Sequence, residues 1–137
     1  MKLLDSSLCA FANLYRGRPA TIYAFDVKII AGSPALINRR VFAMAAVGHP
    51  DGIKCDVSGN VYAGCGDGVE VWNPAGTMIG KILVGGGVAN FSFGKNGEMF
   101  ICNEQRLWRV QLAEGTRGAF LDRREEGEMM DLSGEKS

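Results

Sequence analysis

The chain has 137 residues, of which 47% are hydrophobic, and 15 acidic residues balance 15 basic ones. This apolar content excludes general disorder, and the balanced charge gives no reason to expect nucleic acid or an anionic membrane surface as a partner. No apolar run approaches the roughly 20 residues that span a bilayer. The 19 glycines exceed the usual share of about 7% and separate short apolar runs, which indicates an all-β fold with many turns.

Residues 1–17 form a poorly defined segment without a clear hydrophobic period. Leu8 to Tyr15 fits either a short helix or a strand. The first twelve residues resemble a signal peptide only weakly, because they contain one lysine and a short apolar stretch that Asp5 interrupts. We therefore expect this segment to be retained, which favours a cytoplasmic location.

Two strands are predicted next, because β-branched and aromatic residues dominate Thr21–Val27 and the pattern resumes at Asn38–Ala43, after a turn over Ala31–Pro34. From Gly48 to Ile82, short runs of β-formers alternate with turn residues. This alternation predicts a four-stranded antiparallel meander joined by tight turns. Its predicted strands are Ile53–Asp56, Val61–Cys65, Val69–Trp72 and Met78–Ile82.

The pattern restarts after three consecutive glycines, with further strands predicted at Ala89–Phe93, Met99–Cys102 and Arg106–Leu112. One constant shift along the sequence places Tyr62 on Phe100 and Val69 on Leu107. A weaker copy lies earlier in the chain, where Ile22–Asp26 matches Val69–Asn73. A period of about 40 residues with four short strands per unit is typical of β-propeller blades. The alternative is a β-sandwich whose strands resemble one another only in composition.

Blades of about 40 residues leave room for about two to three four-stranded antiparallel blades in residues 18–113. We therefore predict an all-β fold that is a partial propeller, arranged as an open arc. An open arc exposes blade faces and sheet edges, which predicts self-association through them. Residues 114–137 carry a run of mixed charge and are predicted to be a disordered tail.

None of the four cysteines belongs to a CxxC pair, which argues against a zinc or dithiol redox site. Three of them, Cys55, Cys65 and Cys102, lie in predicted strands. Free cysteine is among the most buried residue types, so we expect these three to act as small buried hydrophobes.

Residues 18–112 resemble the regucalcin/gluconolactonase/lactonohydrolase family, in particular its fungal lactonohydrolase-like members. No single motif is specific, but the order and spacing of several motifs together resemble the later part of a family domain. The resemblance implies a six-bladed propeller with a divalent metal, usually calcium, on its axis, and activity on small lactones. The residues that carry it are Arg18–Val27, Asn38–Phe42, Pro50–Asp56, Gly59–Tyr62, Gly68–Trp72 and Val88–Gly94.

Asp51, in the sequence Pro50-Asp51-Gly52, is the main candidate site residue. The resemblance implies that it is a ligand of the calcium ion, and a carboxylate beside bound water can also act as a general base. The alternative is a turn aspartate, because Pro-Asp-Gly is a common turn sequence. Asn90 and His49 are further candidates for the substrate pocket. The family's glutamate and other asparagine ligands have no counterpart here, so the calcium ligand set of this chain is incomplete.

These observations predict a divalent-metal-dependent hydrolase of small lactones, represented by a C-terminal portion of the family domain. A non-catalytic propeller fragment or a protein-interaction module is the alternative. Additional oxygen ligands beside Asp51 would favour the enzyme, and their absence would favour the alternative.

Overall fold

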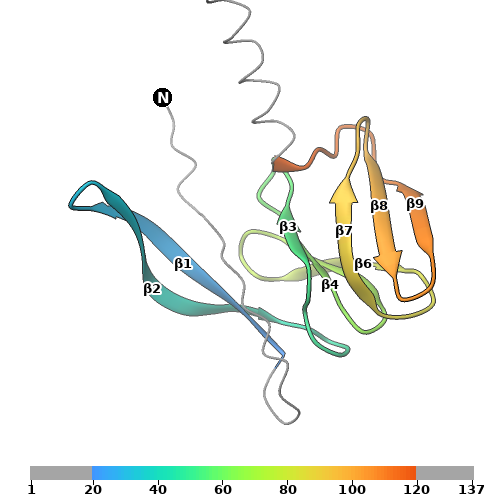
Figure 1. Ribbon diagram of the computed structural model, residues 1–137, viewed down its shortest axis with the longest axis horizontal. Helices are drawn as coiled ribbons and strands as arrows, with labels where there is room; N and C mark the ends of the chain where they lie inside the picture. Colours follow the sequence, from blue (N-terminus) through green and yellow to red (C-terminus); the bar gives the residue numbers. More distant parts are fainter. Residues whose placement is uncertain (1–19, 120–137) are drawn as a thin grey trace, which may run out of the picture.

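The structure is a computed structural model that describes residues 20–119, and it contains nine strands in three antiparallel sheets (Figure 1). The all-β prediction is confirmed, and each strand expected from the sequence is present. None of the described residues forms a helix long and apolar enough to cross a membrane. The strands are β1 (Thr21–Ile30), β2 (Ser33–Met44), β3 (Ile53–Cys55), β4 (Val61–Gly64), β5 (Gly68–Trp72), β6 (Met78–Leu83), β7 (Val88–Phe93), β8 (Glu98–Asn103) and β9 (Leu107–Gln111).

Strands β1 and β2 form a hairpin that extends away from the other two sheets (Figure 1). The turn is shorter than predicted, because Ala31 and Gly32 both adopt positive φ, at 50° and 82°. Two such residues match the twist of a tight hairpin, so pairing continues to the turn. Pro34 was wrongly assigned to the turn and instead pairs with Ile29. An edge strand such as β2 tolerates proline because one side of its backbone needs no strand partner.

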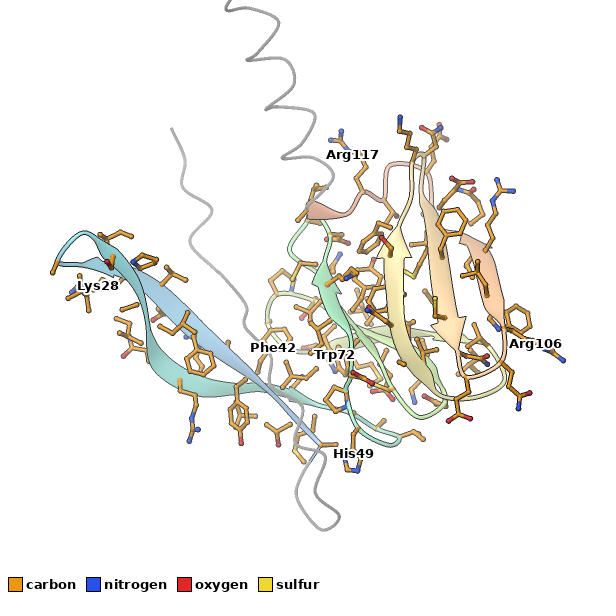
Figure 2. All side chains as sticks on the ribbon, in the orientation of Figure 1. Lys28, Phe42, His49, Trp72, Arg106 and Arg117 are labelled. Atoms are coloured by element: carbon orange, nitrogen blue, oxygen red, sulfur yellow. The ribbon has the colours of Figure 1, made fainter. Side chains whose placement is uncertain are left out.

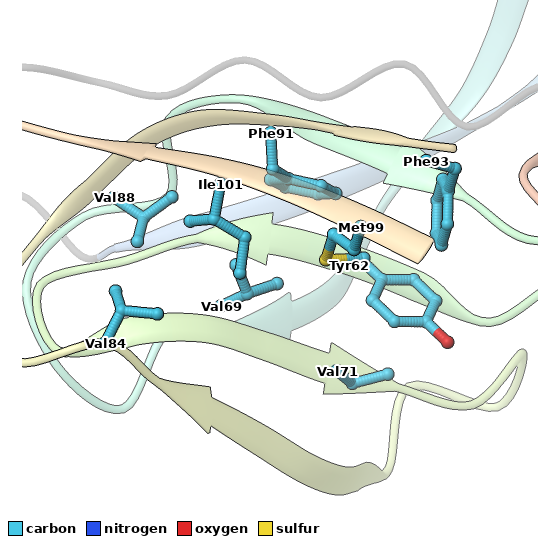
Figure 3. Close-up of a cluster of buried hydrophobic side chains, with 9 residues drawn as sticks. All are labelled: Tyr62, Val69, Val71, Val84, Val88, Phe91, Phe93, Met99 and Ile101. Atoms are coloured by element: carbon cyan, nitrogen blue, oxygen red, sulfur yellow. The ribbon is translucent and has the colours of Figure 1, made fainter. Parts of the chain in front are cut away.

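The second sheet has the order β3-β4-β5-β6 and the third β7-β8-β9, with every strand beside its neighbour in sequence. Only the second sheet has the predicted four strands within the described residues. The hairpin and the second sheet share one apolar core, and the second and third sheets share another (Figure 3). The first core contains Ile22, Ala43, Val61, Ala63, Cys65 and Trp72. The second contains Tyr62, Val69, Val71, Val84, Val88, Phe91, Phe93, Met99 and Ile101.

After β9 the chain returns to the second sheet. The backbone N–H of Val57 donates to the carbonyl of Arg117 at 2.9 Å, and Gly118 forms an antiparallel bridge with Asp56. The start of the predicted tail therefore contacts the turn that follows β3. The rest of the predicted 114–137 tail, which is residues 120–137, and the segment Leu8 to Tyr15 lie outside the described residues.

The three cysteines of the predicted strands differ in exposure. Cys65 is buried and Cys55 is half-buried, as expected for small hydrophobes, but Cys102 is exposed, so that prediction was wrong. Cys102 pairs with Leu107 on the side of the third sheet that faces away from the second sheet. The alternation of a strand places a residue on one of two faces, but it does not say which face another sheet covers.

We expect iodoacetamide to alkylate Cys102 rapidly at pH 8 and to leave Cys65 unmodified. Burial raises the pKa of the Cys65 thiol to about 12, so the reactive thiolate is scarce. The same pKa shift gives Cys65 a stabilising contribution to the free energy of unfolding. This contribution is fully present below pH 9.0 and is lost as pH rises from 9.0 toward 12, because in that range the thiol ionises only in the unfolded chain. Peptide mapping by mass spectrometry measures the modification, and equal labelling of both thiols would contradict the structure.

Candidate functional site

The loop that carries Asp51 is held by backbone hydrogen bonds to two different sheets. The N–H of Asp51 donates to the carbonyl of Gly64 at 2.9 Å, and the N–H of Gly64 donates to the carbonyl of Gly52, also at 2.9 Å. The N–H of Gly52 donates to the carbonyl of Ala89 in β7 at 2.8 Å. The residue before Asp51, Pro50, is fully buried, whereas Asp51 itself is exposed. A fixed backbone therefore presents an accessible carboxylate.

Asn90 lies directly beside this loop. A Cβ atom on Gly52 would stand 2.5 Å from Oδ1 of Asn90 and 2.9 Å from the carbonyl oxygen of Ala89. The lack of a side chain at Gly52 thus allows β7 to approach the loop. Asn90 Oδ1 accepts the backbone N–H of Phe91 at 2.9 Å, which orients the amide. The structure therefore brings Asn90 next to the residue that follows Asp51.

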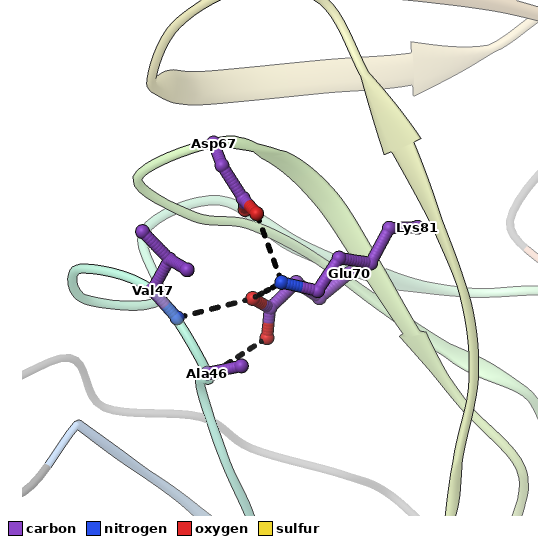
Figure 4. Close-up of polar contacts among 5 residues, drawn as sticks. All are labelled: Ala46, Val47, Asp67, Glu70 and Lys81. Atoms are coloured by element: carbon purple, nitrogen blue, oxygen red, sulfur yellow. Dashed lines mark hydrogen bonds and ion pairs between the residues drawn. The ribbon is translucent and has the colours of Figure 1, made fainter.

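The third predicted residue, His49, is exposed and lies on the loop between β2 and β3 (Figure 2). This loop is held by Glu70, a residue that the sequence reasoning missed. The Glu70 side chain is completely buried and accepts the backbone N–H groups of Ala46 at 2.9 Å and Val47 at 3.2 Å (Figure 4). The sequence pattern of the strand Val69–Trp72 gave no signal of this role.

Lys81 neutralises the buried Glu70 carboxylate. Its Nζ lies 3.0 Å from Oε1 of Glu70 and 2.8 Å from Oδ2 of Asp67 (Figure 4). Hydrogen bonds to Asp67 and then to Glu70 raise the pKa of Lys81 above its usual value, so the ammonium form is favoured. Three charged side chains from β5, β6 and the loop between β4 and β5 therefore fix the loop that leads to Asp51. They act by positioning, because none of these contacts involves Asp51.

The described residues supply too few ligands to hold a metal ion by themselves. Within residues 20–119, no group of three or more His, Cys, Asp or Glu side chains could hold a metal ion. Asp51 and Asn90 carry three side-chain oxygens between them, whereas calcium takes roughly six to eight oxygens. The Asn90 oxygen is also already engaged with Phe91. This part of the chain does not form a calcium site by itself.

A separate cavity of about 300 Å³ lies between the loop before β7 and the loop between β8 and β9. None of the three predicted site residues lines it. Its lining residues are Val84, Gly85, Gly86, Gly87, Asn103, Glu104, Gln105, Arg106 and Trp108. The predicted residues are exposed and lie outside this cavity, at or before the first strands of the second and third sheets.

We expect Gly52→Ala to lower the free energy of unfolding by about 1 to 3 kcal/mol, because the new methyl group would overlap Asn90 and the backbone of Ala89. The Gly80→Ala variant is the matched control, since a Cβ atom there meets nothing within 4 Å. Urea unfolding followed by circular dichroism measures both changes. Equal stability of the two variants would show that β7 does not approach the loop as described.

Comparison with known proteins gives a consistent family assignment. Residues 16–105 match the family described as SMP-30/Gluconolactonase/LRE-like region. A lactonohydrolase, oryH, from Aspergillus oryzae is 35% identical over 94 residues, which cover 67% of this chain and 20% of the relative. A gluconolactonase from Zymomonas mobilis is 28% identical over 114 residues, which cover 78% of this chain and 32% of the relative.

A solved gluconolactonase structure from Xanthomonas campestris matches with a TM-score of 0.59 and 30% identity, over 69% of this chain and 32% of that one. The three sheets thus correspond to part of a propeller fold, as predicted. The chain spans between a fifth and a third of the length of these relatives. It belongs to the SMP-30/gluconolactonase/LRE-like family and is partial relative to its homologues.

Proposed function

We propose that this chain contributes Asp51 and Asn90 to a site that hydrolyses small lactones. The observation that carries the proposal is the placement of an exposed carboxylate on a loop that backbone hydrogen bonds fix to β4 and β7, with an oriented amide beside it. The relatives described as a lactonohydrolase and gluconolactonases support the substrate class.

In this proposal the ionised Asp51 accepts a proton from a water molecule whose oxygen attacks the lactone carbonyl carbon. The ring C–O bond then breaks, and the proton passes to the leaving alkoxide, so that lactone and water give one hydroxy acid. Asn90 Oδ1 accepts from Phe91, which leaves Nδ2 free to donate to the carbonyl oxygen as negative charge develops there. His49, two residues from Asp51, is proposed to border the substrate pocket.

Asp51 is also our proposed ligand for a divalent metal, and the other ligands would have to come from outside the described residues. No step above depends on that ion. Calcium titration by calorimetry, with Asp51→Ala as control, tests this point separately from the reaction. Equal heats of calcium binding in the wild type and in Asp51→Ala would show that Asp51 does not bind the metal.

The reaction itself is tested by proton release during incubation of the chain with glucono-δ-lactone, with added calcium and with a chelator. We expect a rate above that of the spontaneous reaction in at least the calcium-containing sample. A rate equal to the spontaneous one in both samples would remove the hydrolase assignment for this chain.

A non-catalytic propeller module is the second candidate. It is favoured by one observation, which is that the described residues hold no group of three or more His, Cys, Asp or Glu side chains that could bind a metal. A chain that folds cooperatively but shows neither calcium heat nor lactone hydrolysis would support this second candidate.

A further inference from the structure

The cavity beside Trp108 lies where the second and third sheets pack on each other. Trp108 packs against the core that these two sheets share, and it also lines the cavity. Its indole nitrogen, Nε1, is buried and has no hydrogen-bond partner within residues 20–119. Burial of an N–H group without an acceptor is unfavourable, so this atom marks a place for an acceptor.

The internal repeat shows what occupies the equivalent place in the second sheet. The constant shift that relates the two copies places Glu70 on Trp108. Strand pairing agrees, since their partners Ala63 and Ile101 are related by the same shift. In the second sheet the buried Glu70 carboxylate accepts two backbone N–H groups of the loop before β3. In the third sheet an indole stands at this position, and β9 supplies no carboxylate to the loop before β7.

The loops around the cavity are also further apart than their equivalents. A Cβ atom on Gly48 would stand 2.8 Å from Cα of Gly66, so the loop before β3 contacts the loop between β4 and β5 directly. The shift places Gly48 on Gly86, where the nearest atom to such a Cβ would be Nδ2 of Asn103 at 3.4 Å. At Gly85 a Cβ atom would meet nothing within 4 Å. The third sheet therefore keeps a space of about 300 Å³ where the corresponding loops of the second sheet touch.

Hydrogen-bond donors border this space. Gly85–Gly87 have no side chains, so their backbone lines the cavity, and their N–H groups have no partner within residues 20–119. Asn103 Oδ1 accepts the backbone N–H groups of Gln105 at 3.2 Å and Arg106 at 3.0 Å. This arrangement leaves Nδ2 of Asn103 as a donor on the side of the glycine loop. The cavity therefore offers several donors and calls for a ligand that accepts hydrogen bonds.

We propose that this cavity binds a small carboxylate, which takes the place that the Glu70 side chain takes in the second sheet. The carboxylate oxygens accept hydrogen bonds from Trp108 Nε1, from Asn103 Nδ2 and from the N–H groups of the glycine loop. Hydrogen bonds to a charged acceptor are stronger than those to a neutral one, which favours a carboxylate over a neutral carbonyl group. The inference does not depend on the proposed hydrolysis, because Asp51 does not line the cavity.

The charged lining residues fit an anion that carries a single charge. The guanidinium carbon of Arg106 lies 5.9 Å from the centroid of the Trp108 ring, which places a positive charge beside the indole. This charge plays the part that Lys81 plays for the Glu70 carboxylate. Glu104 also lines the cavity, and its negative charge disfavours an anion with several charges.

The test is titration of the full chain with sodium acetate, followed by two-dimensional proton–nitrogen NMR of the indole N–H groups. The chain has two tryptophans, so Trp108→Phe identifies the signal of each. We expect the Trp108 signal to shift and to saturate in the millimolar range. The Trp72 signal should stay in place, because Trp72 is buried in the other core. Sodium chloride at equal ionic strength is the salt control.

Asn103→Asp should weaken acetate binding at least roughly tenfold, because a carboxylate that repels the ligand replaces the Nδ2 donor. An aspartate oxygen still accepts the N–H groups of the turn, so the variant keeps this turn. Asn73→Asp is the matched control, since Asn73 Oδ1 accepts the N–H groups of Ala75 and Thr77 in the same way but does not line the cavity. It should bind acetate like the wild type. Circular dichroism confirms that each variant is folded.

Three results would overturn the proposal. A Trp108 signal that stays in place, or that shifts without saturating, would show that the cavity holds no carboxylate. Equal shifts with acetate and chloride would show a response to salt alone. Equal acetate affinity in Asn103→Asp and Asn73→Asp would place the bound acetate outside the cavity.

Discussion

Replacement of Glu70 with leucine is expected to lower the free energy of unfolding by about 3 kcal/mol, because the substitution removes the acceptor of two backbone N–H groups, those of Ala46 and Val47. Hydrogen bonds to a charged acceptor contribute roughly 1.5 to 3 kcal/mol each, and the two contributions are not fully additive. Leucine fills a similar volume and recovers part of the lost stability through apolar contact. The expected change is therefore smaller than the sum of the two hydrogen-bond contributions.

The ion pair between Glu70 and Lys81 contributes less to the free energy of unfolding than its short distance suggests. The Lys81 side chain is 26% exposed and also contacts Asp67 at 2.8 Å, so we expect no buried charge to be left unpaired when Glu70 is removed. The two backbone hydrogen bonds therefore dominate the effect. Thermal and urea unfolding of the variant, followed by circular dichroism, measure the change.

Glu98→Leu is the matched control for Glu70→Leu. Glu98 also lies in a strand and also forms an ion pair, with Nε of Arg109 at 2.8 Å, but this pair is at the surface. Surface pairs contribute roughly 0 to 1 kcal/mol, so we expect a change of that size. Equal losses in the two variants would show that Glu70 does not hold the loop between β2 and β3.

Replacement of Asp51 with asparagine is expected to lower kcat/KM for lactone hydrolysis by at least about a hundredfold, if the chain acts as proposed. Asparagine keeps the size and polarity of the side chain but cannot accept the proton of the attacking water. Positioned general bases contribute roughly 100- to 10,000-fold, which sets the lower bound of the expected loss. Proton release from glucono-δ-lactone measures the rate.

Asp26→Asn is the control for Asp51→Asn. Asp26 is a partly exposed aspartate on the hairpin, where it accepts hydrogen bonds from Asn38 at 2.9 Å and Arg40 at 2.7 Å. It makes no contact with the loop of Asp51, so its variant should keep the wild-type rate. An unchanged rate in Asp51→Asn, with both variants folded, would assign the reaction to other residues.

The strands could be predicted from the sequence because their signals are local. Turn residues such as Asn73-Pro74-Ala75-Gly76 end one strand and begin the next, whatever the rest of the chain does. The internal repeat added the order of the sheets, since equivalent positions such as Tyr62 and Phe100 recur together. The propeller class followed from these observations, whereas the family was identified by resemblance. Asp51 was identified as a candidate by resemblance, and its role stays a prediction.

The tertiary structure decided which predicted residues meet. Gly52 and Asn90 are far apart in the sequence, and no pattern showed that the missing Cβ of Gly52 would let β7 approach. The burial of Glu70 depends on the backbone of Ala46 and Val47, which belong to a loop with no strong signal of its own. Both contacts depend on how two elements distant in sequence pack together, which local propensity does not encode.

The exposure of individual side chains was also decided by the tertiary structure. The sequence by itself determined that each strand has two faces, because side chains alternate along an extended backbone. It did not determine which face is covered. Cys65 is buried and Cys102 is exposed, although both lie at or within predicted strands, because a sheet packs over the first and none of the described residues packs over the second. Coverage of a face depends on the presence of a neighbouring sheet, and that is a property of the assembled fold.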